Sequence, residues 1–262
     1  MAVDVVMKGR TAQGTIAWSI SLLLMPWLSL PFYLVLGDRK FIGYERASPE
    51  GSREIDVLAR ALLESLAPFV PPNSEAGFAD RGFTKLARFP FTSGNKVTLL
   101  INGSATFDAI LEAVESAREY IVVQFYIVRD DGLGKRLQRA LLAARKRGVR
   151  VYLLYDEIGS HGLPRAYLQA LKDAGCECSG FRTKARKQRP FRLNFRNHRK
   201  IVVVDGRVAF TGGHNVGDEY LGLHKVLTPW RDTHVSIRGP AVQCVQLAFV
   251  EDWFWATQRV PG

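Results

Sequence analysis

The chain has 262 residues, a length that fits one α/β domain with additional segments. Lysine and arginine outnumber aspartate and glutamate by 36 to 25, and the net charge of +11 predicts an anionic partner, namely nucleic acid, an acidic membrane surface or a phosphate substrate. Three cysteines exclude a disulfide framework and a complete four-ligand zinc site, although Cys176 and Cys178 could take part in a partial one, so a reducing compartment is expected.

The N-terminal region contains a long uncharged segment, TIAWSISLLLMPWLSLPFYLVLG, at residues 15–37. As one helix these 23 residues would extend about 34 Å, enough to cross a hydrocarbon core of roughly 30 Å. Pro26 and Pro31 would also permit a kinked or re-entrant segment. We expect residues 1–46 to form a retained membrane anchor rather than a cleaved signal peptide. The basic residues that flank the segment place the following domain on the cytoplasmic side.

The remainder of the sequence divides into a linker and one folded domain. Residues 47–96 form the linker region, with a short helix expected over residues 55–66 before the turn-rich stretch APFVPPNSEAG. Beyond it, apolar runs alternate with segments of helical periodicity. Strands are predicted at residues 97–101, 120–128, 149–155 and 176–181, with helices across residues 107–114, 133–144 and 164–174. This alternation predicts an α/β domain over residues 97–262, whose mostly parallel sheet is flanked by helices.

The segment NHRKIVVVDGRVAFTGGHN, residues 197–215, holds the residues of greatest chemical interest. His198 and Lys200 are two positions apart beside a β-branched run, so on a strand both side chains would point to one face. The Asp-Gly pair that begins at Asp205 predicts a tight hairpin, which returns the chain alongside His198. An imidazole, an ammonium and the carboxamide of Asn215 can therefore converge at one spot.

A strongly basic run overlaps the start of this segment. Residues 182–200 include nine lysines and arginines and no acidic residue. The first half of the run is most simply a solvated loop. Its second half leads directly into His198, which favours a local positive field over a site that handles phosphate.

The spacing of these residues resembles the HKD motif of the phospholipase D superfamily. In that pattern His-x-Lys is followed after four residues by Asp, and after six more by Gly-Ser or Gly-Gly, any residue and Asn. The matching residues here are His198, Lys200, Asp205, Gly212, Gly213 and Asn215. Downstream, GGHNVGDEYLG, WRDTHVSIRGPAV and FVEDWFW are similar to the first half of the bacterial cardiolipin synthases. The resemblance covers roughly residues 97–255, and the hydrophobic N-terminus followed by a linker also fits that layout.

The resemblance implies a phosphohistidine mechanism. A neutral His198 would attack the phosphorus of a phosphodiester, while Lys200 and Asn215 donate to its non-bridging oxygens. A second imidazole must protonate the departing alcohol and deprotonate the incoming one. Asp232, in the WRDTHV stretch, is the first choice for the carboxylate that fixes the tautomer of His198. No metal ion or other cofactor is required.

Other polar residues near the motif receive supporting roles. Asp205, although part of the catalytic motif, is expected to bond backbone amides near the hairpin rather than carry protons. Asp218 and Glu219 are reserves for the carboxylate that fixes the tautomer. His214 is expected to be peripheral, and His234 an ordinary surface or core histidine. The expected substrate contacts are Arg196, Gly212, Gly213 and Glu219.

Superfamily active sites combine two such motifs, in one chain or in two subunits, because one histidine attacks while the other acts as acid and base. This sequence has one His-x-Lys with the later Asp, and it ends about where the resembling enzymes continue. We therefore expect a second half on another chain or a homodimer, and little turnover by the monomer alone.

The expected function is phosphatidyl transfer between two phosphatidylglycerol molecules with release of glycerol, at the bacterial inner membrane with the catalytic domain in the cytoplasm. Transfer to water or another alcohol would instead define a dimeric single-motif phospholipase D. A dimeric nuclease whose basic run follows nucleic acid is another alternative. The uncharged N-terminal segment speaks against nucleic acid as a partner, because a nuclease does not need it. A third alternative is a non-catalytic half that only binds anionic lipid.

Overall fold

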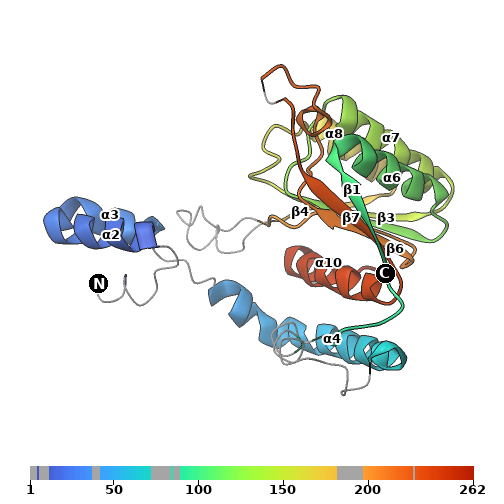
Figure 1. Ribbon diagram of the computed structural model, residues 1–262, viewed down its shortest axis with the longest axis horizontal. Coiled ribbons are helices and arrows are strands. Elements are labelled where there is room, and N and C mark those ends of the chain that lie inside the picture. Colours follow the sequence, from blue (N-terminus) through green and yellow to red (C-terminus); the bar gives the residue numbers. More distant parts are fainter. Residues whose placement is uncertain are drawn as a thin grey trace. The chain divides into compact units, whose positions relative to one another are not determined.

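The computed structural model describes residues 12–36, 42–71, 89–181, 197–226 and 228–262, together with the single positions 5 and 84. The chain falls into two compact units, residues 1–48 with 183–195 and residues 49–182 with 196–262. In its described part, the first unit contains a pair of short helices, whereas the second contains a seven-stranded sheet (Figure 1).

The uncharged N-terminal segment folds into two helices, α2 (Ala12–Leu24) and α3 (Pro26–Leu36), which contact each other. The hydroxyl of Ser29 in α3 donates hydrogen bonds to the carbonyl oxygens of Ser21 and Met25, at 2.8 and 2.6 Å. These bonds tie α3 back to the end of α2, so the pair forms a helical hairpin.

The sequence allows either a single crossing helix or an interrupted segment over residues 15–37, and the interrupted arrangement is the one observed. Across the described ranges, no helix is both long and apolar enough to cross a membrane. The interruption falls before Pro26, because proline lacks the N–H group that would continue α2 but suits the first position of α3. The hairpin leaves large apolar side chains exposed, among them Leu24 at 76% and Trp27 at 93%.

Helix α4 (Ile42–Leu66) crosses the expected boundary between anchor and linker, which lies between residues 46 and 47. The short helix expected over residues 55–66 is the C-terminal part of this longer helix. A 3-10 turn, η1 (Ala67–Phe69), follows it. The first part of the predicted linker is thus helical.

Seven strands form one mixed sheet in the order β1-β7-β6-β5-β2-β3-β4. Their bounds are β1 (Lys96–Ile101), β2 (Tyr120–Phe125), β3 (Arg150–Asp156), β4 (Glu177–Phe181), β5 (Ile201–Val204), β6 (Val208–Gly212) and β7 (Thr233–Arg238). The β2–β3 and β3–β4 pairs are parallel, and the other four pairs are antiparallel. The predicted α/β domain is confirmed, but the prediction of a mostly parallel sheet is wrong.

The connections explain why the sheet is mixed. Helices α7 (Gly132–Lys146) and α8 (Arg165–Asp173) carry the chain over the sheet between β2, β3 and β4, as parallel neighbours require. Strands β5 and β6 are joined by a tight turn, in which Asp205 and Gly206 have φ angles of +51° and +62°. This is the turn predicted from the Asp-Gly pair, and such a direct reversal imposes antiparallel pairing.

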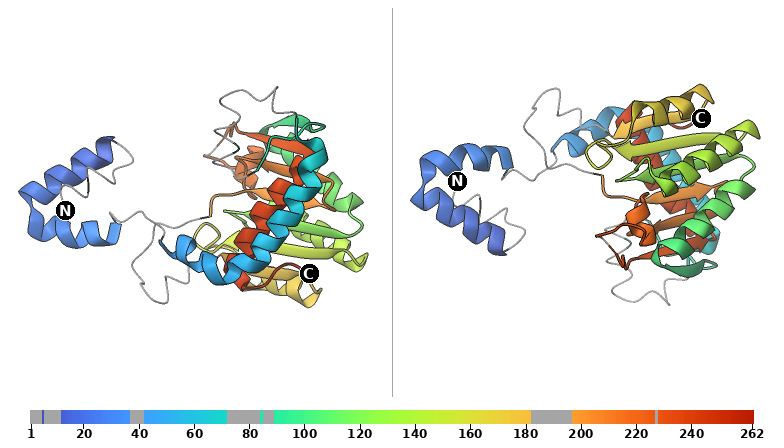
Figure 2. Two further views of the ribbon diagram at one scale, coloured as in Figure 1. Left: turned by 90° about the horizontal axis from the view of Figure 1, so that it is seen from below. Right: turned by 90° about the horizontal axis from the view of Figure 1, so that it is seen from above.

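Helices cover both faces of the sheet. Helices α6 (Asn102–Ser116), α7 and α8 lie on one face, and α10 (Ala241–Thr257) lies on the other (Figure 2). In the central strand β2, alternate side chains point to the first face, where Ile121, Val123 and Phe125 join the main hydrophobic core. The core thus holds β2 rigidly, and the site lies where this strand ends.

Candidate functional site

The candidate site forms where β5 begins. Ile201, the first residue of β5, pairs with Gln124 near the end of β2 and with Thr211 near the end of β6. The residues just before β5 therefore lie beside the loop that follows β2. A pocket of about 490 Å³ opens there. Its lining residues are His198, Arg199, Lys200, Ile201, Thr211, Gly212, and Cys244, Val245 and Ala248 of α10.

His198 and Lys200 both line this pocket, as their spacing predicts. The imidazole of His198 stacks on the ring of Tyr126, with ring centroids 4.1 Å apart and planes at 25°. The ammonium of Lys200 lies 5.7 Å from the centroid of the same tyrosine and donates to the backbone oxygen of His198 at 2.6 Å. Sequence reasoning missed Tyr126, because it stands within an apolar run that predicts only a strand.

The charge of Lys200 is only partly solvated. Burial lowers the pKa of its ammonium, and the negative charge of Asp232 partly offsets that effect. Because a desolvated ammonium attracts an anion more strongly than a fully hydrated one, Lys200 is suited to hold a phosphate oxygen beside His198.

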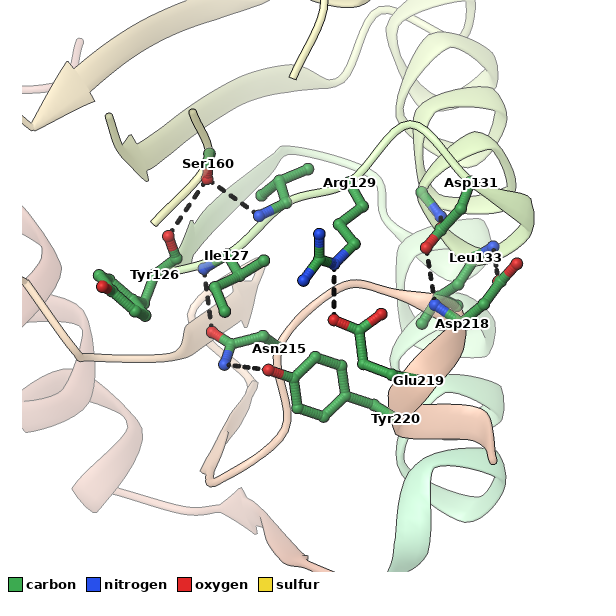
Figure 3. Close-up of polar contacts among 12 residues, drawn as sticks. Tyr126, Ile127, Arg129, Asp131, Leu133, Ser160, Asn215, Asp218, Glu219 and Tyr220 are labelled. Carbon is green, nitrogen blue, oxygen red and sulfur yellow. Dashed lines mark hydrogen bonds and ion pairs between the residues drawn. The ribbon is translucent and has the colours of Figure 1, made fainter. Parts of the chain in front are cut away.

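Asn215 is buried, and its carboxamide holds other parts of the chain. Its oxygen accepts a hydrogen bond from the backbone N–H of Ile127 at 3.0 Å, and its amide donates to the hydroxyl of Tyr220 at 3.0 Å (Figure 3). The neighbouring Val216 also bonds the backbone of Ile127. Asn215 therefore anchors the loop after β2, the loop that carries Tyr126. Its contact with a phosphate oxygen stays a prediction.

The two reserve carboxylates hold the same loop from its far end. Glu219, which is buried, pairs with Nε of Arg129 at 2.6 Å (Figure 3). Asp218 accepts hydrogen bonds from two backbone N–H groups in the first turn of α7, at 3.1 and 2.8 Å. Asp131, the residue before α7, accepts in turn from the backbone N–H of Asp218 at 2.7 Å. A substrate contact by Glu219 stays a prediction.

Asp205 bonds backbone amides, the role expected for it. Its carboxylate accepts from the N–H groups of Arg118, Glu119 and Tyr120, at 2.8 to 2.9 Å, and so joins the β5–β6 turn to the start of β2. Burial raises the pKa of Asp205, but the three N–H groups lower it by more, so the pKa lies below its usual value. A carboxylate so engaged is suited to structure rather than to proton transfer.

Asp232 lies among the motif residues. A Cβ atom added to Gly213 would overlap the carboxylate of Asp232, so this carboxylate lies directly against Gly213. The negative charge of Asp232 raises the pKa of Lys200, His214 and His234, against the larger lowering effect of burial. Asp232 is therefore placed to act on the site electrostatically, and its bond to His198 stays a prediction.

Gly212 and Arg196 are the remaining residues expected to contact the substrate. Gly212 lines the pocket. A Cβ atom there would lie 2.5 Å from the backbone oxygen of Thr233, so a side chain at this position has no room. Arg196 lies outside the described residues.

The two histidines considered peripheral or ordinary form a buried pair. His214 and His234 are 0% and 1% exposed, and their Nδ1 atoms are 3.2 Å apart. Thr106 adds a hydroxyl 3.3 Å from Nδ1 of His214. Burial, followed by the neighbouring His214, lowers the pKa of His234 to about 4, and burial also lowers the pKa of His214. The expectation of a peripheral His214 is wrong, because this side chain is part of the core beside the site.

Comparison with known proteins finds sequence similarity to one group of enzymes. The family model described as "Cardiolipin synthase, PLD-like domain" matches residues 110–229. Over nearly its whole length the chain is similar to cardiolipin synthase A of Pseudomonas putida strain GB-1, with 50% identity across 99% of this chain and 55% of the relative. Cardiolipin synthase A of Pseudomonas fluorescens strain SBW25 is 48% identical over the same shares. The chain spans about half the length of the curated relatives it matches.

Two solved structures align with part of this chain. The phospholipase D family member Nuc from Salmonella typhimurium aligns with a TM-score of 0.46 and 23% identity, covering 64% of this chain and 98% of that one. NucT from Helicobacter pylori aligns with a TM-score of 0.48 and 14% identity, covering 62% of this chain and 98% of that one.

Proposed function

We propose that this chain provides one half of a phosphatidyltransferase that makes cardiolipin from two phosphatidylglycerol molecules. The observation that carries the proposal is the pocket in which His198 and Lys200 lie together against Tyr126. Similarity to cardiolipin synthase A over nearly the whole chain supports the choice of lipid.

In the first step, a nitrogen of the neutral His198 ring attacks the phosphorus of phosphatidylglycerol. A phosphorus–nitrogen bond forms, the bond from phosphorus to the terminal glycerol oxygen breaks, and the departing glycerol takes a proton from a second imidazole. Lys200 stabilises the negative charge on the non-bridging oxygens. The products are a phosphatidyl-histidine and free glycerol.

In the second step, the terminal hydroxyl of another phosphatidylglycerol gives its proton to the same second imidazole and attacks the phosphorus. The phosphorus–nitrogen bond breaks, which releases cardiolipin and restores His198. The second imidazole belongs to another HKD motif, either in a separate second half or in a second copy of this chain. Residues 97–262 serve as the catalytic half-domain in this scheme.

We also propose that the protein acts at the bacterial inner membrane with the sheet on its cytoplasmic side. The exposed apolar side chains of α2 and α3 are suited to contact lipid, and the net charge of +11 attracts anionic headgroups. These features support a membrane partner over nucleic acid.

The test is a lipid-transfer assay. The full chain in detergent is incubated with phosphatidylglycerol, with and without a chain that carries a second HKD half, and cardiolipin and glycerol are measured. We expect both products only when a second motif is supplied by that chain or by dimerisation, and only with His198 intact. His224→Ala is the matched control, because it removes an exposed histidine that is not among the residues lining the pocket.

Three results would contradict the proposal. Phosphatidic acid in place of cardiolipin would indicate a phospholipase D. Cleavage of DNA without any lipid product would indicate a nuclease. An unchanged lipid-dependent function in His198→Ala would indicate a half that binds lipid without catalysis.

A further inference from the structure

Two buried carboxylates outside the motif hold the residue that precedes His198. One oxygen of Asp156, at the end of β3, accepts a hydrogen bond from the backbone N–H of Asn197 at 3.0 Å. Oδ2 of Asp252, in α10, accepts from the side-chain amide of Asn197 at 2.8 Å. Both carboxylates are 2% exposed. Asp156 of β3 thus holds the main chain of Asn197, and Asp252 of α10 holds its side chain.

Asp156 also shapes the surface against which the His198 ring stacks. Its second oxygen accepts from the N–H groups of Ile158 and Gly159, both at 2.9 Å, and so closes the turn after β3. Tyr126 lies directly on this turn, because a Cβ atom on Gly159 would come within 2.7 Å of the tyrosine ring. The carboxylate of Asp156 therefore holds both the backbone before His198 and the turn against which Tyr126 packs.

The next residue of the turn fixes the backbone at this tyrosine. Ser160 donates its hydroxyl to the backbone oxygen of Tyr126 at 3.2 Å and accepts from the N–H of Val128 at 2.9 Å (Figure 3). The loop after β2 is thus held by this turn on one side and by Asn215 on the other.

Asp252 joins α10 to the same segment. Besides Asn197, its Oδ2 accepts from the amide of Gln124 at 2.7 Å and from Nη1 of Arg199 at 2.9 Å. Arg199 closes the loop, because its backbone N–H donates to the side-chain oxygen of Asn197 at 3.0 Å. Burying a carboxylate is costly unless hydrogen bonds and an opposite charge compensate it, and here both are present.

We propose that Asp156 and Asp252 are positioning residues that set the orientation of the His198 imidazole from outside the motif. Neither has to touch the lipid, because each acts through Asn197, and Asp156 acts also through Tyr126. The inference rests on the proposed function only in taking His198 as the nucleophile. Its consequence is kinetic, since a reacting group displaced by about 1 Å can lose roughly 100-fold in rate.

The chemistry of the two carboxylates predicts a graded result. Asp156 uses both oxygens as acceptors, so Asp156→Asn must turn an NH₂ group toward a backbone N–H that has lost its acceptor. The three donors at Asp252 converge on one oxygen, so Asp252→Asn can keep a carbonyl there and loses only the charge. Asp156→Asn should therefore disturb His198 more than Asp252→Asn does.

The test reads the His198 ring directly by NMR of the full chain. Its ring-proton signals are assigned by their loss in His198→Ala, and stacking on Tyr126 should shift them upfield. We expect Tyr126→Leu to abolish this shift, Asp156→Asn to reduce it strongly and Asp252→Asn to reduce it partly. Asp108→Asn is the matched control, because it removes an exposed carboxylate of a surface pair with Arg136 and should leave the shift unchanged.

A stability control separates positioning from loss of structure. Phe249→Leu changes a fully buried residue of α10 that makes none of these hydrogen bonds, so it should lower the melting temperature without moving the His198 signals. Cardiolipin formation with a second half should fall roughly tenfold to 100-fold in Asp156→Asn, mainly in kcat, with KM nearly unchanged.

Either of two results would overturn the proposal: His198 signals at their wild-type positions in folded Asp156→Asn and Asp252→Asn, or equal signal shifts in Phe249→Leu. If the signals move as expected but the wild type forms no cardiolipin with any second half, the positioning is supported and the proposed function is the part that fails.

Discussion

The two ends of the HKD motif differ in their surroundings. At the first end, His198 and Lys200 line a pocket and share the ring of Tyr126. At the second end, His214 and Asn215 are buried, and Asn215 ties the loop after β2 in place. One motif thus supplies both the side chains that line the pocket and the buried side chains that fix the loop beside it.

This difference separates two kinds of variant. Changes at the pocket end should alter the reaction and leave the free energy of unfolding almost unchanged, because half-exposed and exposed side chains contribute little to it. Changes at the buried end should lower the free energy of unfolding. They should affect the reaction only by unfolding the protein or by displacing the loop after β2. Variants at the two ends therefore test which side chains take part in the reaction and which stabilise the fold.

The largest effect is expected for Lys200→Met. The substitution keeps a long, unbranched side chain and removes the positive charge, so cardiolipin formation with a second half should fall about 10²- to 10³-fold. The free energy of unfolding, measured with urea, should change by less than about 0.5 kcal/mol. A normal transfer rate would show that Lys200 takes no part in the reaction. A large loss of stability would show that Lys200 stabilises the fold instead.

Asn215→Ala should mainly affect stability. It leaves the N–H of Ile127 and the hydroxyl of Tyr220 without their partner inside the protein, which should cost about 2–4 kcal/mol in urea unfolding. Asn215→Asp retains an acceptor for Ile127 and serves as the conservative comparison. A variant that keeps full stability but loses transfer would show that the carboxamide acts on the phosphate rather than on the loop.

The buried histidine pair predicts a dependence of stability on pH. Its pKa values are depressed, to about 4 for His234, so in acid the unfolded chain binds protons that the folded chain excludes. Stability should be complete above about pH 6.5 and fall by up to about 3 kcal/mol as the pH decreases to 4. Urea unfolding at pH 7 and pH 5 should show a smaller difference in His234→Asn than in the wild type. An equal difference would mean that the pair does not titrate as described.

The smallest effect is expected for Asp205→Asn. The asparagine keeps one acceptor oxygen for the N–H groups of residues 118–120 and loses the charge, so the free energy of unfolding should fall by about 1–2 kcal/mol. The depressed pKa of Asp205 predicts that this contribution is present near neutral pH and is lost as the pH falls through that pKa. Transfer per folded molecule should stay near the wild-type rate, whereas a loss of several orders of magnitude would make Asp205 a proton carrier.

Local patterns in the sequence predicted the local structure well. The Asp-Gly turn at Asp205 and the convergence of His198 and Lys200 follow from spacing and side-chain alternation alone. The antiparallel pairings of β5 with β2 and of β7 with β1 and β6 did not follow, because the periodicity of apolar residues does not report the direction in which a strand pairs. Hydropathy alone does not choose between one long helix and an interrupted segment over residues 15–37, because it reports total apolarity, whereas the structure shows the interruption before Pro26.

The rest of the site depends on long-range contacts. Asn197 meets Asp156 and Asp252 across 41 and 55 residues of sequence, and no local pattern predicts such a meeting. The burial of Asn215 and the pairing of His214 with His234 likewise appear only once the strands are in register. Sequence spacing thus identifies the residues proposed to react, whereas the fold identifies the residues that hold them in place.

The most direct test of the account is to trap the covalent intermediate. The full chain, with its second half, is mixed with phosphatidylglycerol and stopped in mildly alkaline denaturant, where a phosphorus–nitrogen bond survives, before peptides are analysed by mass spectrometry. We expect a phosphatidyl adduct on His198 that is absent from His198→Ala and from chain kept without lipid. Cardiolipin formation with the adduct on another residue of this chain would contradict it.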